Sequence, residues 1–279
     1  MGAAATSNWS DLARRAASGL LLAAIALALA WWGGYPFALF WAAAALLVLG
    51  EWEGIVSRGA ASSAVGPPLG AVAVAVAIAA AMWGAHVASL SFLVAGGAAV
   101  AALHRGRPAA GLAGLGVPYA GAMAIPIIVL RDGSSSGLVA VLFVFAAVWG
   151  SDIMAYFFGR TFGGPKLWPS VSPKKTWSGF LGGTLCGAAA AAACALAAGF
   201  GQAGLLFLVG IVLAVLSQGG DLLESALKRR FGAKDAGTLI PGHGGLMDRL
   251  DGFVAASLGA LLIGLARNGA DPAAGLLLW

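Results

Sequence analysis

Long apolar stretches, separated by short polar breaks, recur along the whole chain. They lie at residues 16–33, 35–50, 69–85, 87–103, 110–130, 137–159, 177–199, 203–223 and 252–266. A helix needs about 20 apolar residues to cross the hydrocarbon core of a bilayer, and it satisfies its own backbone polar groups there. The pattern therefore predicts an all-α fold, a polytopic transmembrane helical bundle of about nine spans. Pro36, Pro118 and Pro126 are expected to kink or bound their helices.

The composition agrees with a bilayer as the solvent of this chain. Hydrophobic residues make up 60% of its 279 residues, and charged residues only 10%. Soluble domains carry about 25% charged residues, so this chain is too poor in charge to cover a water-facing surface.

The basic residues are divided unequally between the two sides of the predicted bundle. If the N-terminus is cytoplasmic, only Arg131 and Arg267 of the sixteen Lys and Arg lie outside, which leaves fourteen inside. The positive-inside rule then explains the net charge of +5 without a nucleic-acid partner.

Arg14 and Arg15 precede a stretch long enough to span, which predicts a first helix rather than a cleaved signal peptide. We expect a multi-pass plasma-membrane protein, favour a bacterial inner membrane, and place its active site at the cytoplasm.

The basic residues also divide the chain along its length. Two inside loops, residues 160–176 and 225–251, hold nine of them, whereas the first half offers little beyond packing. We therefore expect an N-terminal transmembrane region over residues 1–135 and a C-terminal catalytic region over residues 136–279.

Some residues of the spans favour structural roles. Glu51 and Glu53 flank a span, and interfacial charges are the favoured interpretation. Gly179, Gly183 and Gly187 repeat at four-residue spacing, which lets helices approach closely, either within the bundle or between subunits.

Carboxylates inside the sixth and eighth stretches point to chemistry. Asp152 lies in an apolar run, where an ionised carboxylate is expensive and faces a cavity by default, although a buried interhelical ion pair is the alternative. In the eighth stretch, Ser217, Asp221, Ser225 and Lys228 form one polar stripe beside Glu224. Asp221 and Glu224 could ligate a hard cation, whereas polar contacts between helices are the structural alternative.

The segment after the eighth stretch combines cations, glycines and carboxylates. It contains Lys228, Arg229, Arg230, Lys234 and Asp235, then His243, Gly244 and Gly245, then Asp248, Arg249 and Asp251. A basic cluster alone favours anionic lipid headgroups. Cations for phosphate oxygens, glycine amides for phosphate and carboxylates for Mg²⁺ together predict a nucleotide-phosphate site. No second His or Cys accompanies His243, so zinc is not expected.

A second inside loop can add phosphate contacts. It contains Lys174, Lys175 and Thr176, which echo the end of a Walker A motif, but the glycines that this motif requires are absent. A plain positive-inside loop is the alternative.

These residues resemble a known family. The chain reads Ser225-Ala-Leu-Lys228-Arg229-x4-Lys234-Asp235-x-Gly237-x2-Ile240-Pro241-x-His243-Gly244-Gly245-Leu246-x-Asp248-Arg249-Leu250-Asp251, which resembles the signature of phosphatidate cytidylyltransferases, or CDP-diacylglycerol synthases. The segments around Asp221, from Asp152 to Gly163 and from Ser172 to Trp177 are also similar to this family. The resemblance covers about residues 150–252, and it departs at Ser178, where the family is expected to carry Glu.

The resemblance implies that CTP and phosphatidate react to give CDP-diacylglycerol and pyrophosphate, with Mg²⁺ required. It also implies a homodimer and a two-ion centre at Asp221 and Asp248, whose second ion is expected to be monovalent, such as K⁺. We expect catalytic roles for Asp221, Lys228, Arg229, Lys234, Asp235, His243, Asp248, Arg249 and Asp251. Substrate-binding roles are expected for Asp152, Lys174, Lys175, Ser225, Gly244 and Gly245.

Three other functions are alternatives to this one. A secondary transporter also carries charges inside its spans, but it needs no acidic and basic clusters on one side only. A CTP-dependent polyprenol kinase would share the nucleotide and the membrane but would release CDP. The Asp-Gly-x2-Ala-Arg pattern of CDP-alcohol phosphotransferases is absent.

Overall fold

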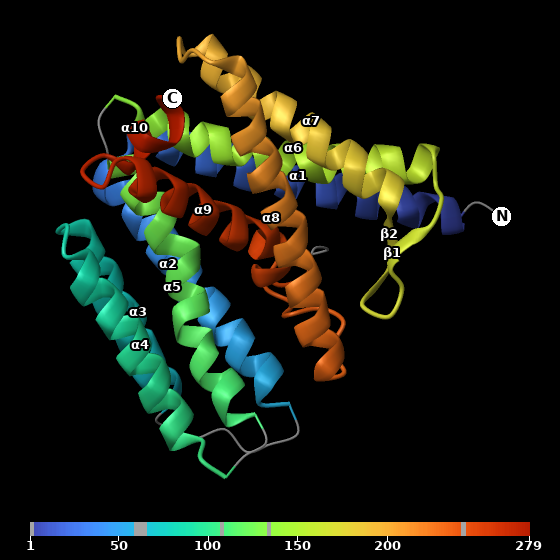
Figure 1. Ribbon diagram of the computed structural model, residues 1–279. Helices are drawn as coiled ribbons and strands as arrows, with labels where there is room; N and C mark the ends of the chain where they lie inside the picture. The colour runs from blue at the N-terminus through green and yellow to red at the C-terminus, as the bar shows by residue number, and fades with distance from the viewer. Residues whose placement is uncertain (1–2, 59–65, 107–108, 133–134, 241–243) are drawn as a thin grey trace.

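Ten α-helices and one β-hairpin follow one another in the computed structural model (Figure 1), which describes residues 3–58, 66–106, 109–132, 135–240 and 244–279. The elements are α1 (Ala3–Trp32), α2 (Gly34–Val56), α3 (Gly66–Met82), α4 (His86–Leu103), α5 (Ala110–Asp132), α6 (Gly137–Thr161), β1 (Lys166–Trp168), β2 (Ser172–Thr176), α7 (Trp177–Ala197), α8 (Ala203–Arg230), α9 (Met247–Arg267) and α10 (Pro272–Leu277). The predicted all-α bundle is therefore confirmed as the main architecture.

Seven of the described helices are long and apolar enough to cross a membrane, namely α2 and α4 to α9. Two shorter apolar segments, Ser18–Trp32 and Gly66–Met82, correspond to the first and third predicted stretches. The chain is thus a polytopic membrane protein, whereas nine spans and a cytoplasmic N-terminus stay predictions. The division of the chain at residue 135 also stays a prediction.

Pro36 lies at the start of its helix, as expected of a bounding proline, whereas Pro118 and Pro126 do not end theirs. Pro118 and Pro126 both lie inside α5, and Pro36 lies in the first turn of α2, where its missing N–H is harmless. Neighbouring helices can satisfy the carbonyl groups that a membrane proline leaves free.

The helices α6 and α7 lie side by side along most of their length (Figure 1). A Cβ atom at Gly179, Gly183 or Gly187 would lie 2.6–2.8 Å from a backbone carbonyl oxygen of α6. Only glycine allows this approach, so the glycine spacing serves packing within the bundle rather than between subunits.

The inside loop 160–176 contains a β-hairpin that the sequence did not indicate. Residues 166–168 and 172–176 pair as an antiparallel hairpin, with Lys166 opposite Thr176 and Trp168 opposite Ser172. The hydroxyl of Thr176 then accepts a hydrogen bond from the amide of Gly179 and caps α7. The hairpin therefore holds Lys174 and Lys175 at a fixed place beside the N-terminus of α7.

The inside loop 225–251 is helical at both of its ends. Because α8 continues to Arg230 and α9 begins at Met247, only residues 231–246 connect them. Gly232, with φ of 64°, lets the chain turn back, so that the amide of Ala233 donates to the Lys228 carbonyl. The charged residues of this segment therefore lie mostly on two facing helix ends.

Candidate active site

Asp248 organises the connection between α8 and α9. Its Oδ1 accepts a hydrogen bond from Lys228 Nζ at 2.6 Å, and both oxygens accept from the amide of Ala236, at 3.1 and 2.9 Å. Its Oδ2 also accepts from the amide of Gly245 at 2.8 Å. At Gly244, with φ of 85°, a Cβ would lie 2.8 Å from the same oxygen. The glycines therefore shape the backbone around this carboxylate.

Lys228 lies between two carboxylates. Its Nζ is 2.6 Å from Asp248 and 3.1 Å from Glu224, and all three side chains are largely buried. Neither Glu224 oxygen accepts a hydrogen bond of good geometry within the described part of the chain. Because Lys228 is held by these two acids, it is not free to meet a phosphate in this arrangement.

Asp221 connects α8 to the hairpin. Its Oδ2 lies 2.6 Å from Lys175 Nζ, and its Oδ1 accepts from Ser225 Oγ at 3.4 Å. The structure thus brings Lys175 and Ser225 to Asp221, whereas the Lys174 side chain is exposed. The two inside loops meet at this ion pair.

Four carboxylates lie within electrostatic reach of one another along these helices. Asp251 interacts with Asp221 and Glu224, and Asp152 interacts with Asp221 and Asp251. Lys175, Lys228 and Arg249 balance them only in part. Carboxylates that repel one another in this way favour a cation beside them.

The donor set fits an open cation site rather than a closed one. No three His, Cys, Asp or Glu side chains among the described residues are close enough to enclose a metal ion. Mg²⁺ commonly binds through one or two carboxylates together with water and substrate phosphates, and it does not need a protein cage. Asp221 is about one-third exposed, so this acid could complete such a site with water and substrate.

Four more predicted residues are exposed, and one lies outside the described residues. Arg229 donates to the carbonyl of Ala233 at 3.4 Å and is exposed, as are Lys234 and Asp235. Arg249 is also exposed and lines the cavity described next. His243 lies outside the residues that the structure describes, so its role stays a prediction.

An apolar cavity of about 400 Å³ adjoins the polar cluster. Its walls come from α1, α2, α6, α9 and the end of the α8–α9 connection. Trp41 stacks on Phe253 with ring centroids 4.7 Å apart, and Phe145 stacks on Trp149 at 4.9 Å, so one wall is aromatic. The charged residues that line the cavity are Asp152 and Arg249. An apolar chamber therefore opens beside the charged groups.

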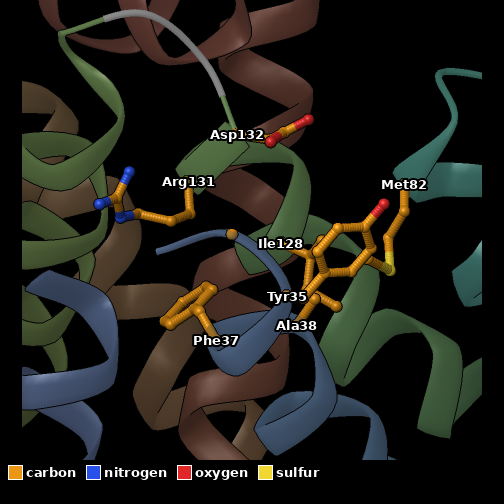
Figure 2. Close-up of a pocket in the computed structure, with 8 residues that line it drawn as sticks. Tyr35, Phe37, Ala38, Met82, Ile128, Arg131 and Asp132 are labelled. Carbon is orange, nitrogen blue, oxygen red and sulfur yellow. The ribbon is translucent and has the colours of Figure 1, made fainter. Parts of the chain in front are cut away.

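A second, smaller cavity of about 170 Å³ lies at the other end of α2, between Gly34 and the end of α5. Figure 2 shows its lining, with Arg131 and Asp132 turned away from each other. Arg131 donates to the carbonyls of Ala30 and Trp31 at the end of α1. Its guanidinium is therefore engaged in joining helices, and the lining of this cavity contains one acid, Asp132.

Two residues that the sequence did not single out for chemistry reach the polar cluster. Glu51, taken as an interfacial charge, accepts hydrogen bonds from the amides of Leu246 and Met247 and so has specific partners in the signature segment. Tyr119 of α5 has a buried hydroxyl without a hydrogen-bond partner in the described part of the chain, and it interacts electrostatically with Glu224 and Asp251. Both contacts join distant parts of the chain, and no local pattern could predict them.

Ser178, at the position where the resembled family is expected to carry Glu, forms local hydrogen bonds. Its hydroxyl donates to the carbonyl of Gly163 at 2.5 Å and lies 3.1 Å from Thr176 Oγ1. It therefore joins the start of α7 to the end of α6, a bond that an ionised glutamate could not donate.

Comparison with known proteins gives a consistent result. The model of the "Cytidylyltransferase family" matches residues 13–264. The phosphatidate cytidylyltransferase of Brucella abortus biovar 1 (strain 9-941) is 41% identical over 269 residues, which cover 91% of this chain and 94% of the relative. The protein of the same name from Brucella melitensis biotype 1 is 40% identical over 265 residues, with the same two coverages. The one from Staphylococcus saprophyticus is 43% identical over 141 residues, half of this chain and 53% of the relative.

Proposed function

This chain belongs to the cytidylyltransferase family, and we propose that it transfers the cytidylyl group of CTP to phosphatidate, giving CDP-diacylglycerol and pyrophosphate in phospholipid biosynthesis. The observation that carries this proposal is the contact between a polar cluster and an apolar cavity. Asp152 and Arg249 line the cavity and interact with each other and with the acids of the cluster. A nucleotide and a membrane lipid can meet at such a boundary.

In the proposed reaction, an oxygen of the lipid phosphate attacks the α-phosphorus of CTP. A new P–O bond forms, the bond between the α-phosphorus and the bridging oxygen to the β-phosphorus breaks, and pyrophosphate leaves with that electron pair. A phosphate monoester has a second pKa of about 6, so the attacking group is mostly a dianion at neutral pH and needs no strong base. The obstacle is repulsion between two anions, so charge neutralisation and alignment are the main tasks of the protein.

We assign these tasks to side chains on two sides of the cluster. Arg229, Lys234 and Arg249 are exposed and can contact phosphate oxygens. Lys175 joins them if it exchanges Asp221 for phosphate. Lys228 instead holds Asp248 and Glu224 in place. The amide of Gly245 is already bonded to Asp248, so phosphate recognition is expected to rely on side chains rather than on this amide.

We further propose that the reaction depends on Mg²⁺, which would neutralise the triphosphate and stabilise the leaving pyrophosphate. Asp221 is the first candidate ligand, because one of its oxygens is only weakly engaged, at 3.4 Å from Ser225. Asp248 is the second, for a further ion such as K⁺, but its oxygens accept from Lys228 and two amides. An ion at Asp248 therefore requires Lys228 to move away.

The apolar cavity is proposed to take the acyl part of the lipid. Its volume of about 400 Å³ falls within the range of ligand pockets, which run from about 300 to 1,000 Å³. Arg249 at its polar edge would then meet the lipid phosphate, while the aromatic wall contacts the chains.

We also propose the cellular location and the oligomeric state of the enzyme. The inner membrane of a bacterium, with the site facing the cytoplasm, agrees with the excess of basic residues on that side and with the location of CTP. A homodimer is proposed from the family resemblance, and light scattering of the purified protein in detergent would test it.

An assay of the purified protein with CTP, Mg²⁺ and phosphatidate tests the function. Pyrophosphate and a liponucleotide should appear together, and omission of Mg²⁺ should stop both. Equal turnover with ATP, or turnover without phosphatidate, would contradict the assignment. Release of CDP in place of pyrophosphate would favour a lipid kinase.

A further inference from the structure

Glu51 reaches from α2 to the start of α9. Its Oε1 accepts a hydrogen bond from the amide of Leu246 at 2.9 Å, and its Oε2 accepts from the amide of Met247 at 2.7 Å. These partners are 195 and 196 residues away in the sequence. One carboxylate of the N-terminal half therefore binds two consecutive amides of the signature segment.

The start of α9 needs such a partner. The first amides of a helix have no acceptor inside it, and Leu is a poor residue for supplying one at the N-cap. Leu246 occupies this N-cap, and no local side chain caps the helix there. Glu51 supplies the missing acceptors, and its negative charge suits the positive end of the helix dipole.

Two glycines of the signature segment make room for this carboxylate. A Cβ at Gly237 would lie 2.7 Å from Glu51 Oε1, and a Cβ at Gly245 would lie 2.7 Å from Oε2. At both positions the three nearest atoms all belong to Glu51. Neither glycine has a positive φ, so the backbone itself would accept alanine. The Glu51 side chain is the steric reason for glycine at these positions.

We propose that Glu51 is a positioning residue for the cytidylyl transfer. By holding the first turn of α9, it sets Asp248 against Lys228 and Asp251 against Asp221 and Glu224. It touches no reacting atom in this scheme. This inference rests on the proposed function, because the effect of Glu51 is measured through the rate of that reaction.

The first test is Glu51→Gln in the full-length protein. An amide oxygen can accept one of the two hydrogen bonds, but the NH₂ group then opposes the other backbone N–H. We expect kcat/KM for CTP to fall by about tenfold or more, with a raised KM for CTP, because misplacement near 1 Å can reduce rates about 100-fold. A residue that only supports folding would reduce the amount of active enzyme and leave the KM of the remainder unchanged.

Glu53→Gln is the matched control. Glu53 lies two residues further along α2, and its Oε1 is 3.5 Å from a Cβ built on Gly70 of α3, so it does not serve α9. We expect its kcat/KM to match that of the unmodified chain. An equal loss in both variants would overturn the proposal.

A double-substitution cycle tests the contact itself. Gly245→Ala should impair the enzyme, because its methyl group collides with Glu51. In the Glu51→Ala background, the same change should have no further effect, because the colliding carboxylate is gone. Gly237→Ala should behave in the same way. If the loss in each double variant equals the product of the losses in its two single variants, the glycines do not act through Glu51.

The two possible failures can be told apart. If the unmodified protein makes no CDP-diacylglycerol from CTP and phosphatidate, the proposed function fails. If it is active and Glu51→Gln retains the normal KM and kcat, the inference about Glu51 fails alone.

Discussion

Near each end of α2, a charged side chain forms hydrogen bonds with the terminus of another helix. The two ends differ in the groups that surround this charge. At one end, Arg131 donates to the last carbonyls of α1. At the other end, Glu51 accepts from the first amides of α9. Each charge has the sign that its helix terminus favours, a cation on carbonyls and an anion on amides.

The difference lies in the polar groups that remain unpaired. Near Arg131, the second cavity contains Asp132 and mostly apolar neighbours. Near Glu51, the helix ends bring together several acids, and the buried hydroxyl of Tyr119 has no hydrogen-bond partner among the described residues. Unsatisfied buried polar atoms are unfavourable for stability and are typical of sites that await a ligand. The comparison separates a helix end engaged only in packing from one that adjoins the candidate active site.

The largest expected effect follows from removing the charge of Asp221 near the Glu51 end of α2, compared with removing that of Asp132 at the other end. Asp221→Asn should lower kcat by at least about 1,000-fold, because it removes the candidate metal carboxylate and the partner of Lys175. Asp132→Asn is the same chemical change at the other end and should leave kcat unaltered. Turnover of both variants, normalised to folded protein in detergent, measures this. Near-normal turnover of Asp221→Asn would remove this residue from the centre.

A large effect on both activity and stability is expected from Lys228→Met. It leaves Glu224 and Asp248 buried without their cation, and breaking a buried pair in this way costs about 3 kcal/mol or more. Thermal unfolding should shift clearly downward, and kcat should fall with it. Arg230→Met, an exposed position on the same helix, serves as the control and should change neither. An unchanged unfolding midpoint in Lys228→Met would mean that the two acids do not need this lysine.

A moderate effect is expected inside the apolar cavity. Ala43 lines the cavity about two helical turns from Glu51, so Ala43→Phe should shorten the space available to an acyl chain. The preference for short-chain over long-chain phosphatidate should rise by about tenfold, as expected for a few lost methylene contacts. Leu46→Phe, outside the cavity lining, should leave the preference unchanged. Equal chain preferences in both variants would place the lipid elsewhere.

The smallest effect on activity is expected from Arg131→Gln. It removes charge-assisted hydrogen bonds to the end of α1, which should reduce stability by about 1 kcal/mol after allowance for partial exposure. The unfolding midpoint should fall by a few degrees while kcat and KM stay the same. A changed KM would show that the two ends of α2 are coupled.

The fold was predictable from the sequence as far as local patterns reach. Apolar length located the long helices, and the glycine spacing in α7 indicated a close helix contact. The β-hairpin was missed because Lys166–Trp168 and Ser172–Thr176 are short and polar, without the alternation that marks a strand. The polar stripe from Ser217 to Lys228 indicated that α8 continues beyond its apolar stretch, which ends at residue 223.

The site was predictable in its residues more than in its contacts. The stripe from Ser217 to Lys228 does lie along one helix, and Asp221 and Asp248 do lie in the polar cluster. Which acid would pair with which cation could not be read from spacing, because the ion pairs join different helices. Glu51 was missed for the same reason, since its partners are about 195 residues away.

The contact between Glu51 and α9 also sets a time at which the enzyme can become active. During synthesis at about 5 to 20 residues per second, the 195 residues between the two partners take roughly 10 to 40 seconds to emerge. Throughout this interval, α2 can already be inserted while its carboxylate still lacks its amide partners and relies on water near the membrane surface. A nascent chain released after α8 but before α9 has emerged would contain Asp152, Lys175 and Asp221 but no assembled site. Incomplete products would therefore remain in the membrane without consuming CTP.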